Sequence, residues 1–149
     1  MKLSVRVPAR GRAIILTSWW GTAVFVLVEA VATLSPDAFG AVVTVVDFAL
    51  FGLGIAAFFW AYAIAVSRSR EDEISVIGLY LLQGCAPSEV RRALLAPLVV
   101  QTVVAIAAAA LRVYSPLAFG VLVPMFGLGL AGLWAARHGE FPPRVRSTR

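Results

Sequence analysis

The sequence predicts an all-α integral membrane protein with four transmembrane helices arranged as two hairpins. Three observations lead to this fold class. The 149-residue chain is 60% hydrophobic and 14% charged, with a mean hydropathy of +0.89, whereas soluble domains are about 45–50% apolar and about 25% charged. The chain contains four long apolar runs, and its basic residues gather on one side of them. The composition argues against a soluble enzyme, a disordered chain and a nucleic-acid-binding domain, and the length fits a single domain.

Each apolar run is long enough to cross a membrane as a helix. A hydrocarbon core of about 30 Å requires about 20 helical residues, and barrel strands would instead give alternating segments of about 10 residues. The first run follows basic residues and contains Ala30-Val31-Ala32, which fits a signal peptide, but we expect an uncleaved helix because this run has a counterpart later in the chain. The predicted spans are 13–34, 41–66, 93–111 and 117–136, with tight, proline-containing turns at 35–40 and 112–116.

The basic residues predict the orientation. All but one of the 13 Lys and Arg residues precede the first span, lie between the second and third, or follow the fourth; only Arg112 lies on the other side. Such a bias places both termini in the cytoplasm, so we predict a multi-pass protein of the cell inner membrane. Residues 1–12 form a basic N-terminus. Residues 137–149 form a basic tail that we expect to be disordered and attracted to anionic lipid.

The two hairpins carry an internal repeat. SPDAFG at 35–40 recurs as SPLAFG at 115–120, and FGLGIA at 51–56 recurs as FGLGLA at 126–131. Because both hairpins begin and end inside, the halves would be parallel repeats about an axis along the membrane normal. Small residues at four-residue spacing favour close packing of helices within the bundle, and the alternative is that they form a dimer interface. These small residues are Ala57, Ala61 and Ala65 in the second span and Gly127, Ala131 and Ala135 in the fourth.

Three ionisable residues in or beside the spans form the candidate site. Glu29 lies near the end of the first span and Asp47 near the start of the second, so both are about 8–9 Å below the outer end. Arg112 ends the third span on the same side. Because charges inside membranes often mark functional sites, we hypothesise a proton or cation site formed by Glu29 and Asp47, with Arg112 as counter-charge. The alternative is an interfacial structural cluster. The repeat does not duplicate these charges, which fits one asymmetric site.

No residue set in the sequence favours catalysis. Cys85 is the only cysteine and His138 the only histidine, so an internal disulfide and a histidine-rich metal site are excluded. Ser18, Ser35 and Ser115 have no histidine near them in the predicted topology. We therefore expect no enzymatic activity, no metal and no cofactor.

Residues 67–92, between the second and third spans, form the only sizeable segment outside the spans. Ser69-Arg70-Glu71-Asp72 fits a capping box, and apolar residues at helical spacing follow it. These features predict a helix over 70–84 along the cytoplasmic interface, ending at Gly84. Its apolar face would be covered by lipid headgroups, by the bundle itself or by a partner protein. The residues expected to contact a partner are Ile74, Ile77, Leu81, Arg91 and Arg92.

The same segment contains, directly before an apolar run, the pattern Glu73-Ile74, Val76, Leu79, Leu81-Leu82, Gly84-Cys85-Ala86 and Val90-Arg91-Arg92. This pattern resembles the cytoplasmic loop of FtsX-like and MacB-like ABC permeases. In that family the loop carries a coupling helix that contacts an ATPase, so the resemblance implies a protein partner for residues 70–92. The family's glutamate-to-glycine spacing is about one helical turn shorter, and six residues here replace its large periplasmic domain. As a whole, the chain resembles small membrane proteins of high-GC actinobacteria in its Ala-, Val- and Arg-rich usage and its GLGLAGLWAARHG ending.

Two functions follow as hypotheses. The first is a non-enzymatic accessory or scaffold subunit of the membrane that contacts a partner through residues 70–92. The alternative is a small oligomeric transporter or ion channel that uses Glu29 and Asp47. The expected partners are the lipid bilayer, a membrane or cytoplasmic protein and further copies of this chain; no nucleic acid is expected.

Overall fold

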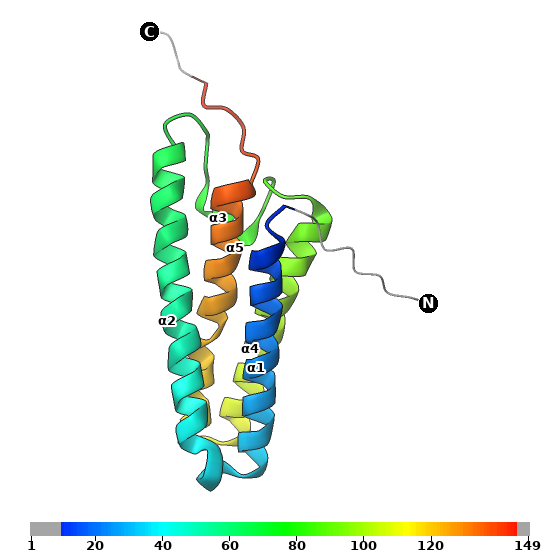
Figure 1. Ribbon diagram of the computed structural model, residues 1–149, viewed down its shortest axis with the longest axis vertical. Coiled ribbons are helices and arrows are strands. Elements are labelled where there is room, and N and C mark those ends of the chain that lie inside the picture. The colour runs from blue at the N-terminus through cyan, green and yellow to red at the C-terminus, as the bar shows by residue number, and fades with distance from the viewer. Residues whose placement is uncertain (1–9, 146–149) are drawn as a thin grey trace, which may run out of the picture.

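The computed structural model describes residues 10–145, and these form a bundle of long helices packed side by side (Figure 1). Four segments are long and apolar enough to cross a membrane: the three helices α1, α2 and α4, and the stretch from η1 through α5. This confirms the predicted all-helical class and its four candidate spans. The elements are α1 (Arg12–Leu34), α2 (Pro36–Arg68), α3 (Val76–Leu81), α4 (Ser88–Leu111), the 3-10 helix η1 (Pro116–Leu122) and α5 (Pro124–His138).

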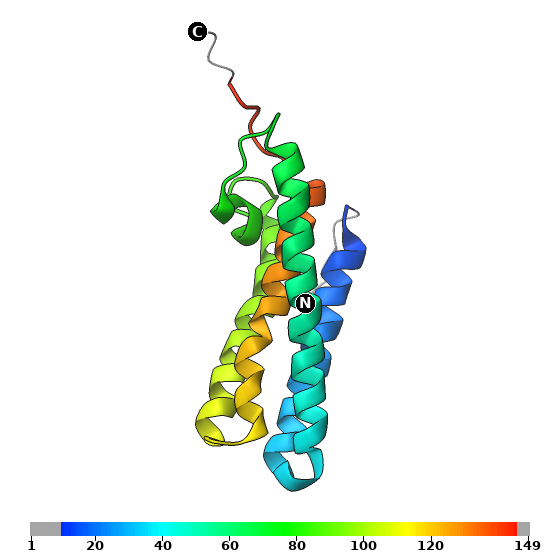
Figure 2. The ribbon, with the colours of Figure 1, turned by 90° about the vertical axis from the view of Figure 1, so that its left-hand side faces the viewer.

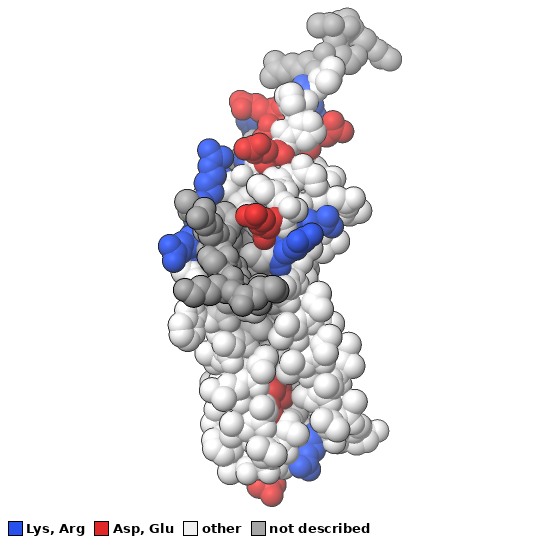
Figure 3. All heavy atoms as spheres, turned by 90° about the vertical axis from the view of Figure 1, so that its right-hand side faces the viewer, with Lys and Arg blue, Asp and Glu red and all other residues white. Residues whose placement is uncertain are grey.

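Two hairpins make up the bundle, α1 with α2 and α4 with η1–α5 (Figure 2). Helix α2 packs most extensively against α5, while α1 contacts both α2 and α4. We call the end where α3 and both ends of the described chain lie the capped end, and the opposite end, with the two turns, the hairpin end (Figure 1). In Figure 3 the charged side chains gather toward these two ends and most of the surface between them is uncharged, as a surface facing lipid requires.

Prolines start three of these helices and shape the connections. Pro36 begins α2 directly after Ser35, so the first turn, predicted over 35–40, is a single residue. The fourth span, predicted as one helix over 117–136, is divided at Val123. Pro124 has no N–H to donate and its ring crowds the preceding turn; the chain before it winds as a 3-10 helix, and α5 starts anew at Pro124.

The predicted helix over 70–84 is wrong in extent, because α3 covers only Val76–Leu81. The capping box predicted at 69–72 does not form, since the Arg68 Nη2 donates to the Asp72 carboxylate at 2.8 Å and Asp72 pairs with Pro143 in a β-bridge. The hydroxyl of Ser75 caps α3 instead, accepting from the Gly78 N–H at 2.9 Å. The helix ends at Leu82, whose φ of 55° turns the chain away before Gly84.

The segment after α5 is attached to the bundle rather than free. We call residues 139–145 the C-terminal strap. The Glu73 N–H donates to the Pro142 carbonyl and the Arg144 N–H to the Glu71 carbonyl, both at 2.8 Å. The Arg68 guanidinium also donates to the carbonyls of Ala136 and Gly139, which caps the end of α5. The expectation of a disordered tail is therefore wrong for residues 139–145. Residues 1–9 of the basic N-terminus and residues 146–149 of the basic tail lie outside the described residues.

Apolar side chains fill the bundle as three clusters along its axis. One lies at the capped end, one in the middle around Phe25, Leu50 and Phe126, and one at the hairpin end around Val43 and Leu117. The small residues singled out in the sequence are all buried, which fits packing within the bundle. Gly127 faces α4, where an added Cβ would lie 3.2 Å from the Leu98 Cα atom.

Candidate functional site

Two carboxyl groups lie inside the bundle near its hairpin end. Glu29, on α1, is 2% exposed and Asp47, on α2, is fully buried. In the described part of the chain, no N–H or hydroxyl group donates to any of their four carboxylate oxygens. The two carboxyl groups are neighbours, close enough for the charge of Asp47 to act on Glu29. The structure thus brings together the two acids that the sequence predicts as a site.

Helical periodicity explains why both acids face inward. On α1, the inward-facing residues recur every three or four positions, and Glu29 follows Phe25 and precedes Ala32 on that stripe. On α2, Asp47 takes the same place between Val43 and Leu50. Both acids therefore occupy positions that the packing of the helices forces into the interior.

The chemistry of such a pair depends on protons. Two adjacent negative charges in an apolar interior repel each other and lose their hydration. Among residues 10–145, no cationic side chain forms an ion pair with either acid to offset that cost. A hydrogen bond between two carboxyl groups needs a proton on one of them, because a carboxylate only accepts. The geometry therefore accommodates a shared proton, and gaining or losing one proton changes the charge of the interior by one unit.

Apolar layers enclose the pair along the bundle axis. Phe25 and Leu50 lie on the side of the capped end, and Ala32 and Val43 on the side of the hairpin end. The 3-10 helix η1 lies against Glu29: a Cβ added at Gly120 would lie 2.6 Å from the Glu29 Oε1 atom. A 3-10 run of seven residues is long for this helix type, and such stretches often mark hinges. The pair is enclosed in this structure, and η1 is the irregular element beside it.

Arg112 does not join the two acids. Its Nη2 atom donates to the Thr33 carbonyl at 2.9 Å at the exposed end of α1. Within residues 10–145, the ion pairs are Arg10 with Glu140 and Arg68 with Asp72, so neither acid is paired with Arg112. The counter-charge proposed from the sequence is thus placed at the surface of the hairpin end, apart from Glu29 and Asp47.

A second buried polar cluster was not identified as a site from the sequence. The Gln101 amide donates to the Thr22 hydroxyl at 2.7 Å, and its carbonyl oxygen accepts from the Gly127 N–H at 3.2 Å. Gly127 lies in the first turn of α5, where N–H groups have no intrahelical partner, so Gln101 caps a helix that begins inside the bundle. Two residues in the sequence could have indicated this cluster: Gln101, a glutamine within an apolar span, and Pro124, which begins the uncapped first turn of α5.

The residues expected at a partner interface fall into two groups. Ile74 is partly buried against the cluster at the capped end, whereas Ile77 and Leu81 are 55% and 40% exposed. Arg91 and Arg92 are exposed on the first turn of α4. The opposite face of α3 is buried against α5, so the bundle covers half of this short helix and leaves the other half open.

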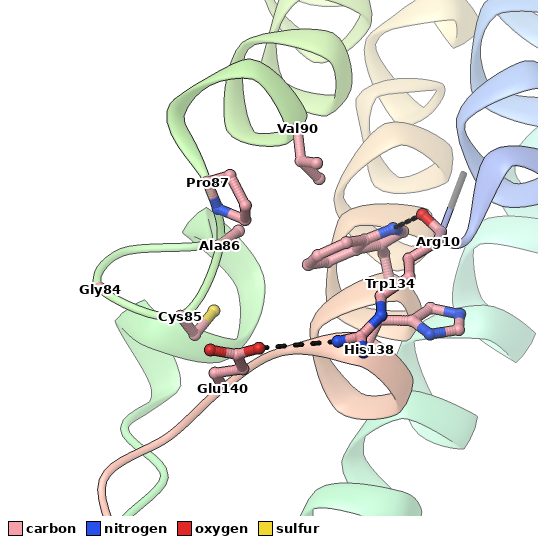
Figure 4. Close-up of a pocket in the computed structure, with 9 residues that line it drawn as sticks. All are labelled: Arg10, Gly84, Cys85, Ala86, Pro87, Val90, Trp134, His138 and Glu140. Atoms are coloured by element: carbon pink, nitrogen blue, oxygen red, sulfur yellow. Dashed lines mark hydrogen bonds and ion pairs between the residues drawn. The ribbon is translucent and has the colours of Figure 1, made fainter. Parts of the chain in front are cut away.

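A further pocket of about 440 Å³ opens at the capped end (Figure 4). Its rim is tied by the ion pair of Arg10 with Glu140 and by the Trp134 indole, which donates to the Arg10 carbonyl. Cys85 lines the pocket, and its thiol donates to the Gly78 carbonyl. Burial raises the pKa of the Cys85 thiol, which keeps it protonated and unreactive. Among the described residues, no group of three His, Cys, Asp or Glu side chains is arranged to hold a metal ion.

The roles of these residues are inferred from the chain itself. Its most unusual feature is the enclosed carboxyl pair, because buried carboxyl oxygens normally have donors. The chain matches no family model, no curated protein and no solved structure.

Proposed function

We propose that this protein is a small transport protein of the cell inner membrane that works by taking up and releasing a proton at Glu29 and Asp47. The observation that carries the proposal is the burial of both carboxyl groups, from two different helices, with no donor among residues 10–145 for any of their oxygens. A purely structural cluster would be expected to include a cation or several N–H donors, because unpaired buried polar groups destabilise a fold.

Protonation gives the pair a way to drive a conformational change. With a shared proton, the pair is compatible with the enclosed arrangement. Without it, two like charges would favour a state in which water reaches them, and η1, beside Glu29, is the element whose movement would admit it. Because four helices enclose little space, we further propose that several copies assemble to complete the pathway.

The proposed topology has both termini on the cytoplasmic side. Its support is the distribution of basic residues: within residues 10–145, only Arg112 lies at the hairpin end. We also propose that the two hairpins derive from a duplicated unit. Its support is that Ser35-Pro36 and Ser115-Pro116 take matching places: in each pair the serine is the N-cap and the proline the first residue of the next element, α2 or η1.

Proton flux into liposomes tests the proposal. The purified protein is reconstituted with a pH-sensitive dye inside, and a potassium diffusion potential drives proton entry. Wild-type protein should acidify the lumen faster than empty liposomes. Glu29→Gln and Asp47→Asn should each abolish the excess flux, because an amide keeps the shape and hydrogen-bonding capacity but carries no exchangeable charge.

Asp37→Asn is the matched control for this experiment. Asp37 is also an acid of α2 near the hairpin end, but it is exposed in the first helical turn. It should retain wild-type flux. If wild-type flux equals that of empty liposomes, or if Asp37→Asn and Asp47→Asn reduce it equally, the proposal is wrong.

The exposed face of α3 favours a second candidate function, that of an accessory subunit. Val76, Ile77 and Leu81 are 70%, 55% and 40% exposed, although the other face of α3 is already packed on the bundle. Exposed apolar residues grouped on one short helix are typical of interaction sites. The partner suggested by the permease-like loop is a cytoplasmic ATPase.

Copurification distinguishes this candidate from the transporter. The triple variant Val76→Ser, Ile77→Ser, Leu81→Ser changes only the open face and should leave the bundle folded. If the accessory function is correct, an ATPase should copurify stoichiometrically with the wild type and be lost from the triple variant. A pure homo-oligomer from both would count against a partner and favour the transporter.

A further inference from the structure

A pocket on the side of α4, near the capped end, belongs to neither function proposed above. It encloses about 540 Å³ between the first turns of α4 and the loop formed by residues 82–86. Its α4 lining is polar and basic at Ser88, Arg91 and Arg92, and apolar at Leu95, Ala96 and Val99. The pocket therefore combines a cationic part and an apolar part in one cavity.

The two parts follow one another along a single helix face. The lining residues recur every three or four positions, so they form one stripe on α4. From Arg91 to Val99 the helix rises about 12 Å. The charged part lies toward the capped end, and the apolar part continues onto the side of the bundle, where Val99 is 59% exposed.

The basic part has unsatisfied capacity for an anion. In the described chain, neither Arg91 nor Arg92 forms an ion pair, and Glu89, the nearby acid of the same turn, is exposed and pairs with neither. The first turn of α4 also lacks a side-chain cap, so its free N–H groups add positive potential.

We propose that this pocket binds an anionic phospholipid, with the phosphate at Ser88, Arg91 and Arg92 and the start of an acyl chain along Leu95 and Val99. A soluble anion would use only the basic part and leave the apolar part in water. A phospholipid uses both, in the order in which α4 presents them as it enters the proposed membrane. The inference goes beyond the proposed transport function and does not depend on Glu29 or Asp47.

Native mass spectrometry of the full chain in mild detergent tests the site. Phosphatidylglycerol and phosphatidylcholine with identical acyl chains are added at equal concentration. The wild type should retain phosphatidylglycerol preferentially. Arg91→Gln with Arg92→Gln should lower its retention by about tenfold or more. Arg70→Gln with Arg137→Gln removes the same charge from exposed positions at the same end and should leave retention unchanged.

A second variant tests the apolar part of the pocket separately. Ala96→Trp keeps both arginines but fills the groove, and it should displace the lipid as strongly as the double arginine variant. Equal retention of the two lipids, equal loss in the two double arginine variants, or unchanged retention in Ala96→Trp would each overturn the proposal. Displacement of phosphatidylglycerol by excess inorganic phosphate would also overturn it, by identifying a free-anion site.

Discussion

Helices α2 and α5 approach closely at Gly54, and we predict that Gly54→Ala destabilises the protein. An added Cβ at Gly54 would lie 2.5 Å from the Phe126 nitrogen and 2.6 Å from the Met125 carbonyl carbon. Both atoms belong to the backbone, so no side-chain rotation relieves the clash and the two helices must move apart. Overpacking of this kind costs about 1–3 kcal/mol.

Gly52 provides a matched control two residues away on the same helix. An added Cβ at Gly52 meets nothing within 4 Å. Gly52→Ala should therefore be neutral or stabilise the helix by up to about 1 kcal/mol, the usual gain of alanine over glycine. Both substitutions receive this gain, so the difference between them isolates the cost of separating α2 from α5.

Thermal unfolding in mild detergent measures this difference. For a chain of this size, about 1 kcal/mol corresponds to about 2–4 °C in Tm. Gly54→Ala should melt below Gly52→Ala by at least that amount. If the two variants melt together, or if Gly52→Ala is the less stable, the close backbone contact between α2 and α5 is not present in the protein and the reasoning fails.

Three further predictions follow from buried contacts. Gln101→Leu should lower the unfolding free energy by about 1–3 kcal/mol, because the Gly127 N–H loses its acceptor. Thr102→Val removes only a hydrogen bond within α4, so in the same melting experiment it should lower the unfolding free energy by less. Arg68→Gln should speed proteolytic cleavage within 139–145, because Arg68 ties Asp72 to the end of α5, whereas Arg70→Gln at an exposed position should not. Maleimide should label Cys85 slowly at neutral pH, because burial raises the pKa of the Cys85 thiol, and labelling should speed up only at a pH above the range of an ordinary thiol. As a control, the double variant Gln83→Cys, Cys85→Ser carries its cysteine at an exposed position and should label at the ordinary rate.

Hydropathy and length predicted the parts of the fold that depend on composition. The spans at 13–34 and 93–111 end at the same residues as α1 and α4, Leu34 and Leu111. The sequence also predicted Glu29 and Asp47 as members of one site, because both lie at similar depth within apolar spans, where charged residues are rare. Continuous apolar runs determine such features locally, without knowledge of the neighbouring helices.

Features that depend on contacts between distant segments could not be predicted in this way. The capping box at 69–72 is locally favourable, but Arg68 and the C-terminal strap hold Asp72 in a different arrangement. The strap itself looks like a disordered tail, because its order comes from pairing with residues 71–73. Likewise, Arg112 was predicted as counter-charge from its depth alone, and its direction is set by the Thr33 carbonyl of a neighbouring helix.

The carboxyl pair and the interruption of the fourth span are best understood as one arrangement. A continuous α-helix would satisfy its own backbone groups, which is what an apolar environment favours. The chain instead contains a 3-10 segment, and α5 begins inside the bundle with the side chain of Gln101 as its cap. In the 3-10 segment itself, Gly120 leaves the space that the Glu29 carboxyl fills. A bundle that only needed stability would require neither the 3-10 interruption nor the two acids. The contact between η1 and Glu29 therefore favours a site that changes conformation, rather than one that only contributes to packing.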